Sequence, residues 1–434
     1  MNAESGAEVL RKVLLRLVPF SMLLFFVQMT DKTNVSYAAL QMNEQLGFTP
    51  EVYGFGAGIF FLGAFLFEIP SNLILLRVGA QRWLARIMIT WGLIVVAMAW
   101  VRSAHAFYLL RFLLGAAEAG LLPGVLFYLG TWIPEQRRGI ASSWLMSAAA
   151  IGPMLGAPLA TGIMELHGAF GIEGWQWLFV LEGAATIVVG FITLRYLPNR
   201  PQDARWLEPA EQQWLNEVMG RELAVKQRAG MTSLLAGFLS KRVLLGLAIG
   251  FLLLFCTFGM VLWLPQMLKA FGGLTNMQVG LLSALPFGLG AVGMILCGRS
   301  SDRTGDRRWH LVGAALVAAA GYACAGLAAN NALAFVGMCV GLAGILSTFG
   351  VFWACASDLL GGAAAAGGLA FINTASQLGG FLGPTSVGYL RQTTNSFSTA
   401  LLALAGCAAL TAVVCLALKN PRTAQQTLIS EPAA

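Results

Sequence analysis

Long apolar runs recur along the whole chain and limit what it can fold into. Each run holds about 20 residues, the length that an α-helix needs to cross the hydrocarbon core of a bilayer. Composition agrees, because 57% of the 434 residues are hydrophobic and 11% are charged, whereas about a quarter of a soluble domain is charged. The sequence therefore predicts an all-α membrane protein with twelve spans, at 17–40, 53–76, 84–101, 106–132, 139–164, 177–197, 241–270, 277–297, 309–328, 331–354, 364–390 and 398–418.

The basic residues predict how these spans are oriented. With the N-terminus inside, 22 of the 27 Lys and Arg residues fall in segments that face the cytoplasm. Outside segments hold only Arg102, Lys269 and Arg391. Because cytoplasmic loops carry an excess of Lys and Arg, both termini are predicted to be cytoplasmic. The net charge of +7 is then a sign of membrane topology, and we expect a lipid bilayer and no nucleic acid as a partner.

The chain also repeats itself. Its predicted parts are a six-helix half (1–197), a cytoplasmic linker (198–240), a second six-helix half (241–418) and a cytoplasmic tail (419–434). An R-x-G motif after the second span recurs 226 residues later, and two glycines of the fifth span recur at an offset of 227: Arg77 and Gly79 with Arg303 and Gly305, Gly152 with Gly379, and Gly156 with Gly383. Repeated halves are typical of transporters with a site at the midplane between them.

Four ionisable side chains lie deep within the predicted spans of the first half. Asp31 and Lys32 belong to the first span, and Arg111 and Glu118, seven residues apart and so on one helix face, belong to the fourth. At 1.5 Å per residue, Arg111, Asp31 and Glu118 lie roughly 8, 13 and 18 Å below the outer edge. We therefore expect all four charges to surround one aqueous cavity.

Two cations and two carboxylates suit the movement of an organic anion together with protons. Lys32 and Arg111 can give charge-assisted hydrogen bonds to a substrate carboxylate. A carboxylate withdrawn from water takes up a proton more readily, so Asp31 and Glu118 are candidate proton-coupling groups. The alternative is that each pair only neutralises itself within the fold. Other charges are candidate gates, namely Glu68 near the inner end of the second span and Asp302 with Arg303 in "GRSSDRTGDRR".

Other classes of function find little support in the sequence. The seven cysteines form no C-x-x-C pair and the three histidines are scattered, so we expect no metal site and no cofactor. No Ser/His/Asp or Cys/His arrangement points to an enzyme. Three alternatives stay open: an anion exchanger, a facilitator that follows the substrate gradient, and a carboxylate receptor of transporter fold. We expect a monomer.

Several motifs resemble the anion:cation symporters of the major facilitator superfamily. They cover nearly the whole chain: "DKTNVSYAAL", "GAGIFFLGAFLFEIPSNLIL", "RIMITWG", "RFLLGAAEAGLLPGVLFYLGTWIP", "GWQWLFVLEG" and "AAAAGGLAFINTASQLGGFLGP". The resemblance implies a bacterial inner-membrane importer that moves carboxylates with protons by alternating access. Matched residue by residue, it implies protonation at Asp31 and Glu118 and substrate contacts at Lys32, Asn34, Tyr37, Arg111, Asn373 and, one helical turn further on, Gln377.

Two departures from that pattern bear on the substrate. Relatives usually have Asp-Arg where this chain has Asp31-Lys32, and a Tyr where it has Ala64. The first replaces a planar guanidinium by a compact, rotatable ammonium, and the second removes a hydroxyl and widens the pocket. Both favour an aromatic or less hydroxylated carboxylate over a sugar acid, but the substrate itself stays open.

Overall fold

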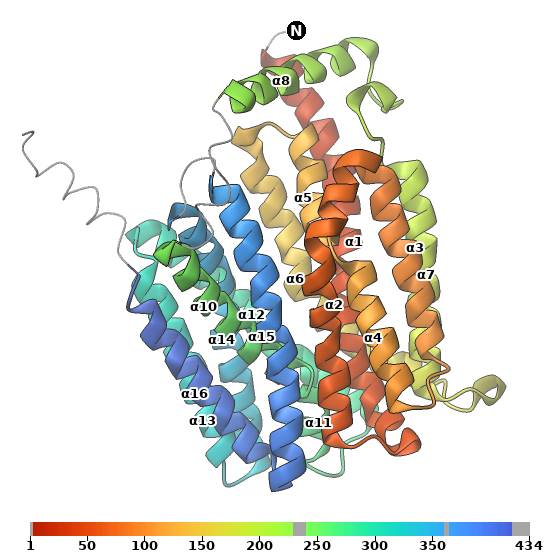
Figure 1. Cartoon of the computed structure of the whole chain (residues 1–434), viewed down its shortest axis with the longest axis vertical. Coiled ribbons are helices and arrows are strands. Elements are labelled where there is room, and N and C mark those ends of the chain that lie inside the picture. Colours follow the sequence, from red (N-terminus) through yellow and green to blue (C-terminus); the bar gives the residue numbers. More distant parts are fainter. Residues whose placement is uncertain (1–2, 229–239, 360–363, 419–434) are drawn as a thin grey trace, which may run out of the picture.

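The computed structural model describes residues 3–228, 240–359 and 364–418, and this part of the chain is almost entirely helical (Figure 1). The predicted tail, 419–434, and residues 229–239 of the predicted linker lie outside the described residues. The α-helices are α1 (Ala3–Leu46), α2 (Pro50–Val78), α3 (Ala80–Met98), α4 (Ala104–Glu118), α5 (Leu121–Trp132), α6 (Glu135–Met164), α7 (Gly174–Tyr196), α8 (Pro209–Arg228), α10 (Lys241–Val261), α11 (Leu264–Lys269), α12 (Asn276–Thr304), α13 (Arg308–Leu327), α14 (Asn331–Leu359), α15 (Ala364–Thr394) and α16 (Phe397–Cys415).

The predicted set of twelve spans is confirmed. Ten helical segments of the described chain are long and apolar enough to cross a membrane, with α4 and α5 counted as one segment. Helices α3 and α15 complete the set. Helix α15 is less apolar than the others because it carries Asn373, Gln377 and several Ser and Thr residues. The protein is therefore an all-α membrane protein, as its apolar runs indicate.

Two of the twelve spans are broken helices, a feature that the apolar runs did not indicate. The fourth span divides into α4 and α5 at Ala119 and Gly120, and Gly120 has a left-handed backbone (φ 87°). The seventh divides into α10 and α11 at Leu262. Each break precedes a proline, Pro123 or Pro265, which lacks the N–H that a helix needs and clashes with the carbonyl four residues earlier.

The internal repeat is visible in the caps of α2 and α12, each 29 residues long. Thr49 and Thr275 cap the two N-termini, and each side-chain oxygen accepts a hydrogen bond from a backbone N–H of the first turn. Gly79 and Gly305 end the two helices with φ of 93° and 67°. Such backbone angles favour glycine, which explains why the R-x-G motif recurs at this distance.

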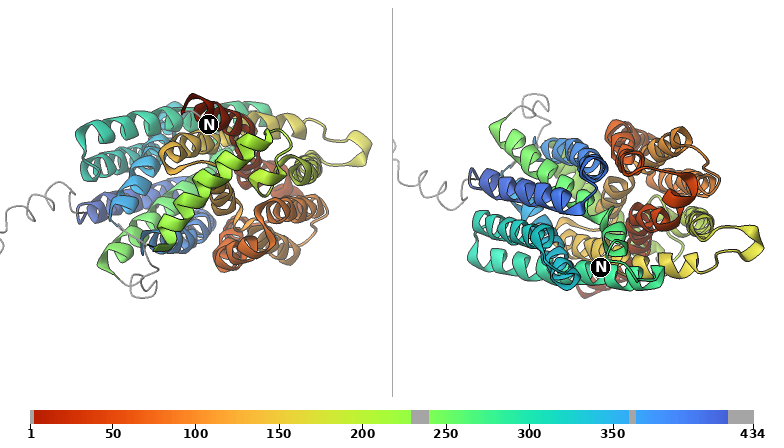
Figure 2. Two further views of the ribbon diagram at one scale, coloured as in Figure 1. Left: turned by 90° about the horizontal axis from the view of Figure 1, so that it is seen from above. Right: turned by 90° about the horizontal axis from the view of Figure 1, so that it is seen from below.

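The two halves lie side by side and are packed together at their outer ends. Helix α2 runs along α15, and α6 runs along α12, as both end-on views show (Figure 2). The Tyr53 hydroxyl donates to the Leu262 carbonyl (2.6 Å), and Asn43 Nδ2 donates to Gln266 Oε1 (3.3 Å). Gly54 and Gly388 let the backbones of α2 and α15 touch. These contacts close the outer side of the interface between the halves.

Two ion pairs join helix α8 of the linker to the first half. It lies beside the N-terminal end of α1 (Figure 1). Lys12 Nζ lies 2.6 Å from Glu211 Oε1, and Arg138 Nη2 lies 2.6 Å from Glu222 Oε1. Much of the linker therefore belongs structurally to the first half.

Candidate substrate and proton site

Two carboxyl groups and one guanidinium come together deep in the first half. Asp31 of α1 is 3% exposed, and Arg111 and Glu118 of α4 are each 1% exposed. The carboxyl groups of Asp31 and Glu118 interact with each other, and Arg111 attracts both. Gln28 Nε2 donates to Glu118 Oε2 at 3.1 Å. Three of the four residues predicted to share one depth, Asp31, Arg111 and Glu118, thus lie close enough to interact electrostatically.

Glu118 stands at the break in the fourth span. It is the last residue of α4, and the helix cannot continue because Pro123 would clash with the carbonyl of Ala119. Ser71 Oγ of α2 instead donates to that carbonyl at 2.6 Å. Irregular backbone at membrane depth is tolerated where protein groups satisfy it or where it lines a cavity. Broken helices of this kind are typical of ion and substrate sites in transporters.

Arg111 is held mainly by backbone atoms of α2. Its Nε donates to the carbonyl of Gly56 (3.3 Å) and its Nη2 to that of Ala57 (3.2 Å). The Cζ atom lies 4.9 Å from the centre of the Phe60 ring. The remaining amino group, Nη1, is buried and has no hydrogen-bond partner within the described structure. Arg111 thus joins α4 to α2 and keeps one donor unused.

Lys32 is the more available cation. Its side chain is half-buried, and its ammonium makes no hydrogen bond or ion pair with the residues that the structure describes. The Nζ atom lies 5.9 Å from the centre of the Phe60 ring. Phe60 therefore contacts both cations, and sequence reasoning gave it no role. An ammonium without a fixed partner can turn toward an incoming anion.

A third carboxyl group of the cluster, half-buried on Glu182, was missed by the sequence analysis. Asn34 Nδ2 donates to Asp31 Oδ1 at 3.1 Å and also to Glu182 Oε2 of α7. The second carboxyl oxygen of Glu182 is buried, with no hydrogen-bond partner in the described part of the chain. Its signal was present in "GWQWLFVLEG", where Glu182 interrupts an apolar run. Tyr37, also on α1, is buried with its hydroxyl facing Ser283 of α12 in the other half.

The second half contributes polar, uncharged groups from α15. Asn373 Nδ2 donates to Glu68 Oε1 of α2 at 2.5 Å, which joins the two halves. Gln377 faces the same carboxyl group. Glu68 is 6% exposed, so this predicted gate residue lies buried against two predicted substrate contacts.

The other predicted gate residues lie elsewhere, at the cytoplasmic end of α12. Asp302 forms an ion pair with Arg307, five residues further on in its own half. Arg303 is exposed to solvent. Asp302 therefore pairs within its own half and not across the interface between the halves. A gating role for Asp302 and Arg303 stays a prediction.

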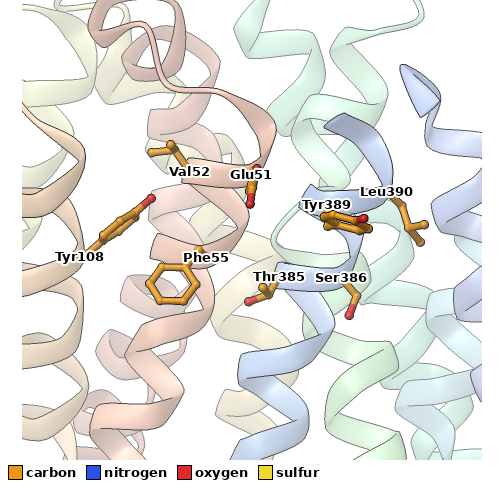
Figure 3. Close-up of a pocket in the computed structure, with 8 residues that line it drawn as sticks. All are labelled: Glu51, Val52, Phe55, Tyr108, Thr385, Ser386, Tyr389 and Leu390. Carbon is orange, nitrogen blue, oxygen red and sulfur yellow. The ribbon is translucent and has the colours of Figure 1, made fainter. Parts of the chain in front are cut away.

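A large groove lies away from this cluster, at the outer ends of α2, α4 and α15. It measures about 820 Å³, and Figure 3 shows its walls: Glu51, Val52, Phe55, Tyr108, Thr385, Ser386, Tyr389 and Leu390. The one charged side chain among these is Glu51, which would repel an anion. The groove therefore suits an organic anion less well than the buried cluster does.

Comparison with known proteins identifies the family. The model of the Major Facilitator Superfamily matches residues 21–384. This chain belongs to that superfamily. A putative tartrate transporter of Agrobacterium vitis is 44% identical over 420 residues, which is 97% of this chain and 96% of the relative. A quinolone resistance transporter of Acinetobacter baumannii is 38% identical, covering 91% of each chain. The putative metabolite transport protein NicT of Pseudomonas putida is 37% identical, covering 94% and 93%.

Solved structures share the fold at low sequence identity. The inward-open xylose transporter XylE of E. coli superposes with a TM-score of 0.75 at 14% identity, covering 95% of this chain and 99% of XylE. A bacterial homologue of the lysosomal transporter Spinster gives 0.73 at 17% identity, with both chains fully covered. The chain is thus a multi-pass transporter of the bacterial inner membrane with the twelve-helix major facilitator fold.

Proposed function

We propose that this transporter imports an organic carboxylate together with protons by alternating access. The observation that carries the proposal is the pair of buried carboxyl groups, Asp31 and Glu118, which interact with each other and with two cations, Lys32 and Arg111. Two buried carboxyl groups in contact favour a state in which they share a proton, because like charges repel strongly away from water. Lys32 supplies a free ammonium for the substrate carboxylate.

The balance of charge supports coupling to protons. With Glu182 and Glu68 included, four carboxyl groups, on Asp31, Glu68, Glu118 and Glu182, are served by two cations, Lys32 and Arg111. A substrate anion adds negative charge, and uncompensated charge is costly to bury. Proton uptake by one of the carboxyl groups offsets that cost. Binding of the anion and of a proton should therefore favour each other.

The names of the relatives support a small carboxylate and guide the choice of probes. Tartrate, named for one relative, is a dicarboxylate and is the first probe. The departures at Lys32 and Ala64 favour less hydroxylated acids, so succinate, benzoate and phthalate complete the panel. A quinolone, which also carries a carboxylate, tests whether the substrate range extends to drugs, as the name of a second relative suggests.

Uptake into proteoliposomes tests this proposal. Purified protein is reconstituted, and each labelled acid is supplied with and without an inward proton gradient. We expect accumulation above equilibrium for one acid of the panel, and loss of that accumulation when a protonophore is added. Equilibration without accumulation would indicate a facilitator, exchange that requires a loaded lumen would indicate an exchanger, and binding without uptake would indicate a receptor.

A further inference from the structure

We propose that the carboxylate of Glu68 occupies the place of the substrate carboxylate while the site is empty, and that substrate binding displaces it. The inference rests on the proposed function, since it names the group that competes with a carboxylate substrate. It makes Glu68 a built-in competitor as well as a link between the two halves.

The surroundings of Glu68 are those that an anion site requires. Asn373 Nδ2 donates to its Oε1 at 2.5 Å, and Thr374 and Gln377 also face the carboxyl group. Lys32 attracts it from α1. Two residues identified on other grounds as substrate contacts, Asn373 and Gln377, thus face a carboxylate that the protein itself supplies, and a third, Lys32, attracts it.

The fit of Glu68 is incomplete, which makes displacement feasible. Its second oxygen, Oε2, is buried and has no hydrogen-bond partner in the described residues. A buried acceptor without a partner is unfavourable, and Lys32 makes no hydrogen bond to it. A free carboxylate can turn both oxygens toward donors, whereas the glutamate is restrained by α2. The substrate can therefore satisfy these donors better than Glu68 does.

The position of Glu68 also links binding to movement. Glu68 belongs to the first half and Asn373 to the second, 305 residues apart in the chain. The hydrogen bond between them joins helices that must move relative to each other when the two halves rock. When a substrate carboxylate accepts the hydrogen bond of Asn373, the link between the two halves is broken, and the halves can move relative to each other.

Affinity measurements on the full-length protein test the inference. The probe is tartrate, or whichever acid of the panel binds the wild type most tightly, measured by calorimetry in detergent. Glu68→Ala removes the competing carboxylate and should tighten binding by about tenfold, the value of one modest charge-assisted hydrogen bond. Glu68→Gln keeps the shape and an acceptor for Asn373, and should tighten binding less. Glu51→Gln, at the outer end of the same helix, is the matched control and should bind as the wild type does.

The outcomes separate this inference from the proposed function. Wild-type binding with equal or weaker binding in both folded Glu68 variants would overturn the competitor role and leave the carboxylate transporter standing. Binding by the variants alone would support the competitor role strongly. No binding by any of the proteins would overturn the proposed function, and the inference with it. Elution as a single symmetric peak in size-exclusion chromatography shows that each variant is folded.

Discussion

Replacing Lys32 by alanine separates substrate binding from folding. The ammonium of Lys32 makes no hydrogen bond or ion pair with the described residues, so its removal breaks no such bond of the fold. Arg111 differs, because its guanidinium holds the carbonyls of Gly56 and Ala57. We therefore expect Lys32→Ala to fold and insert like the wild type while losing affinity for the anion.

The size of that loss follows from the environment of Lys32. A hydrogen bond to a charged group contributes about 1.5–3 kcal/mol, a factor of about 10 to 150 in Kd. The side chain is half-buried, so water screens part of the attraction and the lower end applies, an increase in Kd of about 10- to 30-fold.

Calorimetric titration of the purified protein measures the change. Lys32→Arg restores a cation with a different shape and should retain binding, with an altered ranking of ligands. Arg102→Ala removes an exposed cation and serves as the control. If Lys32→Ala bound the substrate as tightly as the wild type, the ammonium would lie outside the anion site, and Asp31 and Lys32 would only balance each other's charge.

Three further substitutions test other parts of the account. Glu118→Gln should abolish accumulation driven by a pH gradient and leave counterflow exchange measurable; accumulation like that of the wild type would remove Glu118 from the proton path. Glu182→Gln should flatten the pH dependence of substrate Kd, and an unchanged profile would make Glu182 a structural anchor. Gly115→Ala places a methyl group against the Phe60 carbonyl and should lower stability by about 1–3 kcal/mol, seen as a lower melting temperature. Gly298→Ala, where a methyl group meets open space, should leave the melting temperature unchanged. Equal shifts of the melting temperature in the two glycine variants would refute the packing argument.

Features that depend on one segment at a time could be predicted from the sequence. The apolar runs give the twelve spans because the bilayer fixes the length of each helix. The charges of Asp31, Arg111 and Glu118 could be placed at one depth because the helical rise is constant.

Features that depend on tertiary packing could not be predicted in this way. The apolar pattern continues across Gly120, so the break after Glu118 was hidden although Pro123 was visible in the sequence. Glu182 was read as part of an apolar run, because its bond to Asn34 exists only when α7 packs on α1. The bond from Asn373 to Glu68 joins the two halves, and no local pattern indicates such a pairing.

Proton movement driven by substrate tests the central claim most directly. Proteoliposomes that enclose a pH-sensitive dye receive an inward gradient of the transported acid, with no proton gradient imposed and with valinomycin and potassium present to dissipate charge. The account predicts that the lumen acidifies as the acid enters, and that Glu118→Gln abolishes the acidification while the labelled acid still exchanges. Entry of the fully ionised acid without any change in lumenal pH would contradict proton coupling at Asp31 and Glu118.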